Sequence, residues 1–304
     1  MPEPLWQPSP ERISNTRLIA FMAAVEARTG ENFDKDYHRL HRWAVDNPEA
    51  FWTAVWDFCG VVAAERGDVV VADFDRFPGA RWFPGARLNF AENLLRRRDD
   101  HPALVALLEN GARREISYAA LYRAVAQLAA DLRALGVEPG DRVAGFMPNV
   151  PETVIAMLAA TSIGATWSSC SPDFGINGVL DRFGQIQPKV LFAADGYYYN
   201  GKTCDSLERL AGIVEAIDSL EQVIVVPVVS SSPAIANIES AALFDDCLDR
   251  SASEVLFEQL PFDHPLYIMY SSGTTGVPKC IVHGAGGSLL QHLKEHQLLV
   301  DLGS

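Results

Sequence analysis

A run of hydroxyl, glycine and lysine residues has the chemistry of a phosphate-binding loop. Its members are Ser271, Ser272, Gly273, Thr274, Thr275, Gly276 and Lys279. Glycines let backbone N–H groups approach phosphate oxygens closely, hydroxyls add hydrogen-bond donors, and a lysine supplies a positive charge. These residue types predict a site for a polyanion. A Ser/Thr/Gly cluster between two regular elements is also typical of an ordinary loop, so composition alone leaves both interpretations open.

The order of residues in this run, residues 271–279, distinguishes it from the common P-loop. In that motif a lysine directly follows the second glycine. Here Val277 and Pro278 stand between Gly276 and Lys279. The lysine also has a simpler interpretation as a solvated surface charge, since lysines are mostly exposed. We refer to residues 271–279 as the phosphate loop.

The elements around the phosphate loop are expected to place it at the edge of a sheet. The apolar segment 265–270 predicts a buried strand before the loop, and a helix is expected directly after it, over residues 286–300. Open α/β sheets bind ligands beyond the carboxyl ends of strands, where the N-terminus of a helix favours anions. This placement supports the polyanion interpretation.

Strand and helix patterns alternate over the second part of the chain. Helices are predicted from apolar residues three and four positions apart, and strands from short apolar runs. The predicted strands cover residues 103–108, 142–147, 166–170, 190–194 and 223–229. The predicted helices cover residues 89–98, 117–135, 151–163, 178–186 and 206–217, with a short one near Leu243. Repeated βα units predict an α/β fold, with a mostly parallel sheet and helices on both faces.

The first part of the chain is expected to be helical. Helices are predicted from residue 14 or 15 to Gly30, through residues 37–45, and from Asn47 to Gly60. The aromatic residues of the third helix are expected in a core rather than around a cofactor. A connector rich in proline and glycine follows at residues 77–85. We therefore expect a helical N-terminal region, residues 1–88, and an α/β domain that begins at residue 89.

Composition narrows the class of protein. The net charge is −14, from 25 basic and 39 acidic residues, which disfavours nucleic acid and anionic membranes as partners. No apolar run reaches the ~18–20 residues of a membrane span, and the N-terminus lacks the pattern of a secretory signal. The cysteines are scattered, with no metal-binding spacing. They are Cys59, Cys170, Cys204, Cys247 and Cys280. Reduced thiols and a cytoplasmic location are expected.

The order of the phosphate loop resembles the phosphate-binding loop of the acyl-adenylate-forming, or AMP-binding, superfamily. Further blocks along nearly the whole chain resemble one family in it, the acetoacetyl-CoA synthetases. These blocks are residues 4–8, 82–94, 140–143 with 147–149, 167–175, 179–183 and 260–266. Acetyl- and propionyl-CoA synthetases resemble the chain less, because they carry a glycine-rich segment where Ser171, Pro172 and Asp173 stand. One residue departs from the superfamily pattern: Cys280 occupies a place where relatives usually carry Gly or Ala.

The resemblance implies a two-step ligase reaction. A carboxylate oxygen of acetoacetate attacks the α-phosphorus of ATP, with Mg²⁺ on the phosphates, and pyrophosphate leaves. The thiolate of CoA then displaces AMP and forms acetoacetyl-CoA. The resemblance assigns Ser271, Ser272, Gly273, Thr274, Thr275 and Gly276 to the loop around the ATP phosphates. Lys279 is its terminal basic residue, for phosphate contact or loop positioning, and no residue is assigned an acid–base role.

The resemblance indicates fewer residues for CoA binding than for the ATP phosphates. Related synthetases carry basic residues near the 3′-phosphate of CoA at the place of residues 196–202. Only Lys202 is basic here, and three tyrosines fill the neighbouring positions. Lys202 is therefore the candidate for CoA binding. Three loop tyrosines that pack on the surface are an equally simple interpretation.

The resemblance also implies that this chain is an N-terminal fragment. The adenine-binding motif, the ribose-binding aspartate and the mobile C-terminal domain of the family would lie after Ser304. The parent protein is therefore expected to be an acetoacetate–CoA ligase, and residues 1–304 alone are expected to be inactive. Two alternatives remain, a synthetase for another short-chain acid such as acetate or propionate, and a non-catalytic, truncated nucleotide-binding domain.

Overall fold

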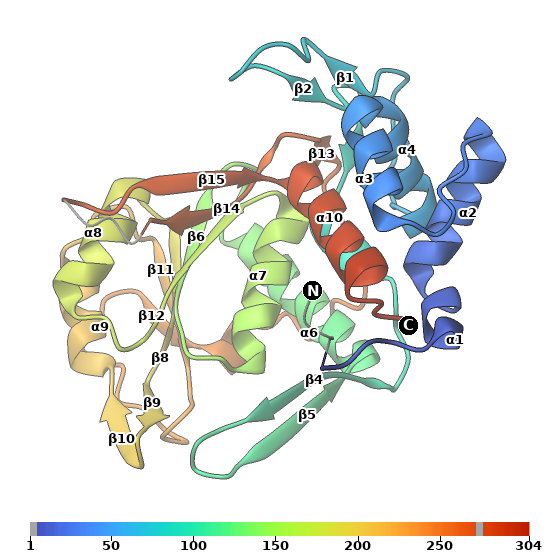
Figure 1. Cartoon of the computed structure of the whole chain (residues 1–304). Coiled ribbons are helices and arrows are strands. Elements are labelled where there is room, and N and C mark those ends of the chain that lie inside the picture. The colour runs from blue at the N-terminus through green and yellow to red at the C-terminus, as the bar shows by residue number, and fades with distance from the viewer. Residues whose placement is uncertain (1–4, 272–275, 304) are drawn as a thin grey trace. The chain divides into compact units, whose positions relative to one another are not determined.

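The computed structural model describes residues 5–271 and 276–303 (Figure 1). The chain forms two compact units. The first contains residues 1–86, 261–263 and 286–304, and the second contains residues 87–260 and 264–285. No helix among the described residues is both long and apolar enough to cross a membrane.

A seven-stranded sheet forms the centre of the second unit (Figure 1). Its strands lie in the order β12-β11-β8-β6-β7-β14-β15. They are β6 (Arg142–Phe146), β7 (Thr166–Cys170), β8 (Val190–Ala194), β11 (Gln222–Val226), β12 (Ala241–Leu243), β14 (Pro265–Tyr270) and β15 (Cys280–Gly284). Neighbouring strands are parallel except at β15, which runs antiparallel to β14. The predicted α/β fold with a mostly parallel sheet is confirmed.

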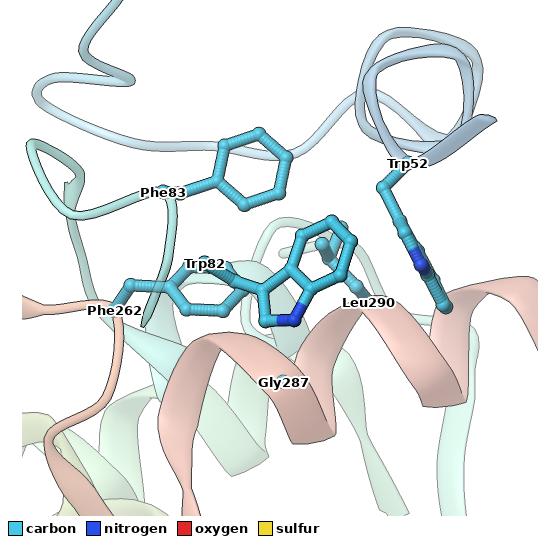
Figure 2. A pocket seen from close by; sticks show the side chains of 6 residues that line it. All are labelled: Trp52, Trp82, Phe83, Phe262, Gly287 and Leu290. Carbon is cyan, nitrogen blue, oxygen red and sulfur yellow. The ribbon is translucent and has the colours of Figure 1, made fainter. Parts of the chain in front are cut away.

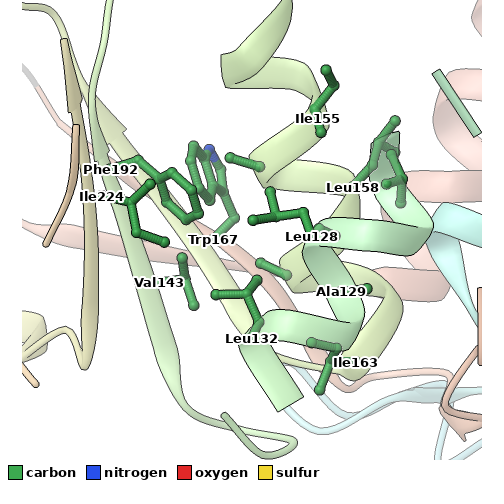
Figure 3. Packing of buried hydrophobic residues seen from close by; sticks show 14 of the residues in the cluster. Leu128, Ala129, Leu132, Val143, Ile155, Leu158, Ile163, Trp167, Phe192 and Ile224 are labelled. Carbon is green, nitrogen blue, oxygen red and sulfur yellow. The ribbon is translucent and has the colours of Figure 1, made fainter. Parts of the chain in front are cut away.

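Helices cover both faces of this sheet, as predicted. Long apolar side chains of α6 (Tyr118–Ala134) and α7 (Pro151–Ile163) pack on one face, against Val143, Trp167 and Phe192 (Figure 3). The other face packs against α8 (Ile176–Ile186) and α9 (Leu207–Glu215). Both sides of the central strands are therefore apolar, which explains why these strands read as continuous apolar runs.

The second unit also contains short elements. The predictions covered a strand at residues 103–108, a helix after Asn89 and a short helix near Leu243, but not the remaining short strands. Two antiparallel hairpins form, one from β4 (Pro102–Leu107) and β5 (Arg113–Ser117), the other from β9 (Gly196–Tyr199) and β10 (Lys202–Asp205). The helix after Asn89 is only α5 (Phe90–Leu94), shorter than predicted, and a 3₁₀ turn spans Phe244–Cys247. The short strands β3 (Arg87–Leu88) and β13 (Leu260–Pro261) form a further two-stranded sheet.

The helix predicted over residues 286–300 is present, but the expectation that it directly follows the phosphate loop is wrong. The chain leaves the loop in strand β15, which pairs with β14 so that Cys280 lies opposite Tyr270 and Val282 opposite Ile268. Helix α10 (Ala285–Leu293) begins only after this strand. Ile281 and Val282 are β-branched and favour a strand, and pairing with β14 supplies the backbone hydrogen bonds. The phosphate loop therefore joins two strands and has no helix N-terminus at its end.

The first unit is built mainly from helices, as predicted. They are α1 (Pro10–Ser14), α2 (Arg17–Thr29), α3 (Tyr37–Asp46), α4 (Pro48–Cys59), most of α10 and a π-helical turn at Lys294–Leu299; strands β1 (Val71–Ala72) and β2 (Arg81–Trp82) pair beside them. Thr16 caps α2 in place of the expected Ser14 or Asn15, through its side-chain oxygen. Gly30 and Gly60 end α2 and α4 in the left-handed conformation, as the glycine stop signals predict.

Candidate functional site

The loops at the carboxyl edge of the large sheet form the candidate site. Because β6, β7, β8, β11 and β14 are parallel, the loops that follow them emerge at one edge. The chain passes from β6 to β7 on one side and then to β8 on the other side of β6. Such a reversal of strand order opens a crevice in which α/β proteins bind ligands. The phosphate loop follows β14, next to β7, and thus lies beside this crevice.

Two hydrogen bonds close the base of the phosphate loop. The Ser271 N–H donates to the carbonyl oxygen of Lys279 at 3.0 Å, and the Lys279 N–H donates to Ser271 Oγ at 3.1 Å. Gly276 has a φ of +90°, a conformation that glycine adopts without strain. Ser272, Gly273, Thr274 and Thr275 lie outside the described residues.

Lys279 presents a free positive charge at this loop. Its side chain is exposed, and it makes no ion pair with the part of the chain that the structure describes. An unpaired ammonium group beside glycine and hydroxyl residues suits an anionic ligand. The exposure of the side chain is equally consistent with a surface lysine, so the role of Lys279 stays a prediction.

A half-buried tyrosine anchors the strand that carries the loop. The hydroxyls of Tyr270 and Ser168 lie 2.8 Å apart, and Ser168 Oγ lies 2.9 Å from the carbonyl oxygen of Ile268. A serine hydroxyl has one proton, so Ser168 donates to Ile268 and accepts from Tyr270. Burial raises the pKa of Tyr270 well above its ordinary value. The phenol therefore stays neutral near pH 7, where it acts as a structural donor rather than as a base.

Two arginines that sequence reasoning missed add positive charge to the same edge. The Arg182 guanidinium lies 4.6 Å from the ring centre of Phe174 and 5.7 Å from that of Tyr270. The Arg209 guanidinium lies 5.8 Å from the rings of both Phe146 and Tyr197 and donates to the carbonyl oxygen of Phe174 at 3.2 Å.

No carboxylate pairs with either arginine within residues 5–271 and 276–303. Arg209 is the third residue of α9 and Arg182 lies in the middle of α8. No sequence motif marks either residue, so only the contacts in the structure place them at this edge.

Lys202 lies on a different part of the edge from the phosphate loop. It begins β10, in the hairpin that follows β8, and pairs with Tyr199 across a two-residue turn. The turn residues Asn200 and Gly201 have φ values of 50° and 72°, as tight hairpins require. Strands β6 and β7 separate β8 from β14, so these two strands lie roughly 14 Å apart at a spacing of ~4.8 Å per strand. The structure does not bring Lys202 and Lys279 together.

A buried carboxylate supports the loop between β11 and β12. Asp195 ends β8 with only 1% of its surface exposed. Its oxygens accept from the backbone N–H groups of Val228, Val229 and Ser230 at 2.7, 3.1 and 2.8 Å. The Asp195 carboxylate is therefore occupied by backbone N–H groups, and Asp195 is a structural residue rather than a ligand-binding one.

An apolar pocket occurs in the first unit, away from these loops in sequence. It measures about 200 Å³ and is lined by Trp52, Trp82, Phe83, Phe262, Gly287 and Leu290 (Figure 2). The rings of Phe83 and Phe262 lie 5.1 Å apart at a tilt of 40°. Since the lining contains no charged or hydroxyl side chain, the pocket lacks the groups that an ATP phosphate requires.

The described residues contain no preformed metal site. No three His, Cys, Asp or Glu side chains among them lie close enough to hold a metal ion. Mg²⁺ in nucleotide enzymes is bound mostly by phosphate oxygens and water, with one or two carboxylates.

Comparisons with known proteins show which proteins this chain resembles. The acetoacetyl-coenzyme A synthetase of Rhizobium meliloti is 47% identical over 296 residues, which cover 97% of this chain and 45% of that protein. The acetoacetyl-CoA synthetase of Macaca fascicularis is 45% identical over 306 residues, with the same coverage. The solved structure of the acetoacetyl-CoA synthetase from Streptomyces lividans superimposes with a TM-score of 0.93 at 44% identity, over 99% of this chain and 46% of that one. The chain thus spans slightly less than half the length of these relatives.

Two family profiles match the chain. The profile of the acetyl-coenzyme A synthetase N-terminus matches residues 37–94. The profile of the AMP-binding enzymes matches residues 90–301, which include the whole parallel sheet and the phosphate loop. This match covers more than half of the sequence, and the chain belongs to the AMP-binding enzyme family.

Proposed function

We propose that the complete protein containing this chain is an acetoacetate–CoA ligase that forms acetoacetyl-CoA, AMP and pyrophosphate. The observation that carries the nucleotide part is the position of the phosphate loop, which follows β14 beside the crevice at β6 and β7. Acetoacetate as the acid is supported by the 47% identity to the Rhizobium meliloti protein.

The proposed reaction has two steps. In the first, a carboxylate oxygen of acetoacetate forms a bond to the α-phosphorus of ATP, and the bond from that phosphorus to pyrophosphate breaks. In the second, the sulfur of CoA attacks the acyl carbon, and AMP leaves. Catalysis of the first step requires that the negative charge of the departing pyrophosphate is stabilised and that the nucleophile is held in line.

The phosphate loop has the groups for this task. We assign Ser271, Ser272, Gly273, Thr274, Thr275, Gly276 and Lys279 to the ATP phosphates, and Mg²⁺ would add positive charge on the same oxygens. The free ammonium of Lys279 and the hydrogen bonds that close the loop at Ser271 support the assignment. Lys202 is assigned to CoA, with its exposure and its place at the carboxyl edge as support. Arg209, on the α9 helix that follows the same hairpin, adds positive charge at that end of the crevice.

We also propose a division of the chain and a location. Residues 1–88 would form a helical region of the acetyl-CoA synthetase type, and residues 89–304 the first part of the adenylation domain. The matched profiles, at residues 37–94 and 90–301, support this division. A cytoplasmic location is consistent with the scattered cysteines, of which Cys170, Cys204, Cys247 and Cys280 are free thiols.

Substrate assays on a complete polypeptide test the proposal. Residues 1–304 would be joined to the remaining part of the Rhizobium meliloti relative, and ATP–pyrophosphate exchange would be measured with acetoacetate, acetate and propionate. Exchange that depends on acetoacetate, with at least tenfold lower rates for the other acids, is expected. Preference for acetate or propionate would favour the alternative of another short-chain synthetase.

Two lysine variants separate the two steps. Lys279→Ala is expected to slow exchange about tenfold or more, because a charge-assisted contact to phosphate contributes ~1.5–3 kcal/mol. Lys202→Ala should leave exchange unchanged, because exchange needs no CoA, and should raise the KM for CoA. Unchanged exchange in Lys279→Ala would contradict the role of the phosphate loop. Residues 1–304 alone are expected to show no exchange.

A further inference from the structure

Helix α8 contacts both loops that border the crevice at β7. Arg182 and Gln185 stand three residues apart on this helix and therefore lie on one side of it. Arg182 lies over the ring of Phe174, in the loop that follows β7, and over the ring of Tyr270, the last residue before the phosphate loop. Gln185 Nε2 donates to the carbonyl oxygen of Pro278 at 2.8 Å, within the phosphate loop.

Gln185 contacts the part of the phosphate loop that carries Lys279. We call this part, residues 276–279, the returning arm of the loop. Pro278 has no backbone N–H, so its carbonyl group is the polar backbone group by which this residue can be held. The next N–H, of Lys279, donates to Ser271 Oγ. The peptide unit between Pro278 and Lys279 is thus held at its oxygen by α8 and at its nitrogen by Ser271. Fixing this peptide unit sets the direction in which the Lys279 side chain leaves the backbone.

The chemistry of the amide side chain suits this task. Its NH₂ group has two protons, and Gln185 uses them on two carbonyl oxygens, those of Asp181 on its own helix and of Pro278 in the loop. A carboxylate of the same shape would place negative charge against both oxygens. Gln185 is exposed, so burial does not force this contact.

We propose that Gln185 is a positioning residue for the phosphate loop. It holds the returning arm of the loop against α8 and thereby directs Lys279 toward the polyphosphate of the nucleotide. Its effect on nucleotide binding rests on the function proposed above, whereas its effect on the geometry of the loop does not.

Hydrogen exchange tests the geometric part on residues 1–304. Amide exchange of peptides that cover residues 276–284 would be measured by mass spectrometry in the unchanged chain, Gln185→Ala, Gln185→Glu and the control Asn177→Ala. Asn177 is exposed on the same helix, and its side chain makes no hydrogen bond within the described ranges. Loss of one hydrogen bond corresponds to about a threefold to tenfold increase in exchange. Both Gln185 variants should show this increase, with unchanged thermal midpoints, and Asn177→Ala should not.

Kinetics of the complete polypeptide test the link to the nucleotide. In Gln185→Ala the KM for ATP should rise about fivefold to tenfold, with the KM for acetoacetate unchanged. Equal amide exchange in all four proteins, or an unchanged KM for ATP, would overturn the proposal. A complete polypeptide that shows no exchange activity would instead contradict the proposed function, and the hydrogen-exchange result would still decide whether Gln185 positions the loop.

Discussion

Ser271 and Lys279, eight residues apart, hold each other at the base of the phosphate loop. Each donates its backbone N–H to the other residue, to the Lys279 carbonyl oxygen at 3.0 Å in one direction and to the Ser271 hydroxyl oxygen at 3.1 Å in the other. The first bond continues the pairing of β14 with β15, whereas the second depends on a side chain. The hydroxyl of Ser271 therefore has a structural use that is distinct from contact with a phosphate.

Replacement of Ser271 separates the hydroxyl from the backbone contact. Ser271→Ala removes the acceptor for the Lys279 N–H, and in the complete polypeptide we expect ATP–pyrophosphate exchange to slow about threefold to tenfold, the value of one hydrogen bond. Ser271→Thr keeps an oxygen at the same place and should retain most of the rate. Equal losses in both variants would show that the side-chain hydrogen bond is not the cause.

Alanine substitutions at two neighbouring glycines of α10 should change the free energy of unfolding in opposite directions. A Cβ added to Gly286 would lie 2.1 Å from Cδ2 of Phe262, whereas one added to Gly287 would meet no atom within 4 Å. Gly287 borders the apolar pocket that Figure 2 shows. Gly286→Ala should lower the free energy of unfolding by about 1–3 kcal/mol through overpacking. Gly287→Ala should raise it by up to about 1 kcal/mol, because alanine favours the helix more than glycine does.

Urea unfolding of the two glycine variants, followed by tryptophan fluorescence, measures this difference. Trp52 and Trp82 line the pocket and report on its environment. Each variant is the control for the other, since the chemical change and the helix are the same. A destabilised Gly287→Ala chain would contradict the open space beside that residue.

Removal of the Asp195 carboxylate should strongly lower the free energy of unfolding. Asp195→Ala would leave the N–H groups of Val228, Val229 and Ser230 without their acceptor. Since hydrogen bonds to a charged group contribute more than neutral ones, the free energy of unfolding should fall by about 3 kcal/mol or more.

Asp205→Ala is the matched control for Asp195. The Asp205 carboxylate is exposed and accepts from one backbone N–H, that of Leu207, at 2.9 Å. Loss of this carboxylate should lower the free energy of unfolding by about 1 kcal/mol or less. Chemical denaturation of both variants gives the two values, and equal effects would contradict the structural role of Asp195.

The cysteines differ in burial, so their thiols should react with iodoacetamide at different rates. Burial raises the pKa of Cys170 to about 12 and that of Cys247 to about 11, and nearby Asp131 and Asp246 add to the second shift. The thiolate is the reactive form, so a raised pKa lowers reactivity at pH 8 by about a hundredfold or more relative to an ordinary thiol. Cys204 and Cys280 are only half-buried. They should react first with iodoacetamide, and Cys170 and Cys247 should stay unmodified in the native chain.

Peptide mass spectrometry after timed labelling identifies the modified cysteines. The denatured chain is the control, because all thiols should react there at similar rates. Labelling of Cys170 should remain slow between pH 7 and 9, because its pKa lies above this range. Native labelling of Cys170 as fast as that of Cys280 would contradict its burial.

Local patterns in the sequence determined most elements and the fold class. The apolar spacing of α6 and α7, the glycine stops at Gly30 and Gly60, and the β-branched run of β11 act over a few residues and therefore can be recognised without a structure. The glycine, hydroxyl and lysine content of the phosphate loop likewise indicated its chemistry. Its order, together with the blocks along the chain, indicated the superfamily.

Only the tertiary structure decided what surrounds the loop. Strand β15 forms because β14 offers it a backbone partner, and the β9–β10 hairpin around Lys202 forms by pairing of its two short strands. Gln185, Arg182 and Arg209 come to the carboxyl edge from helices about 60 to 90 residues before the phosphate loop, and nothing in their own neighbourhood of sequence marks them. Pairing and packing between distant segments depend on the whole chain, so the phosphate loop was visible in the sequence and its supports were not.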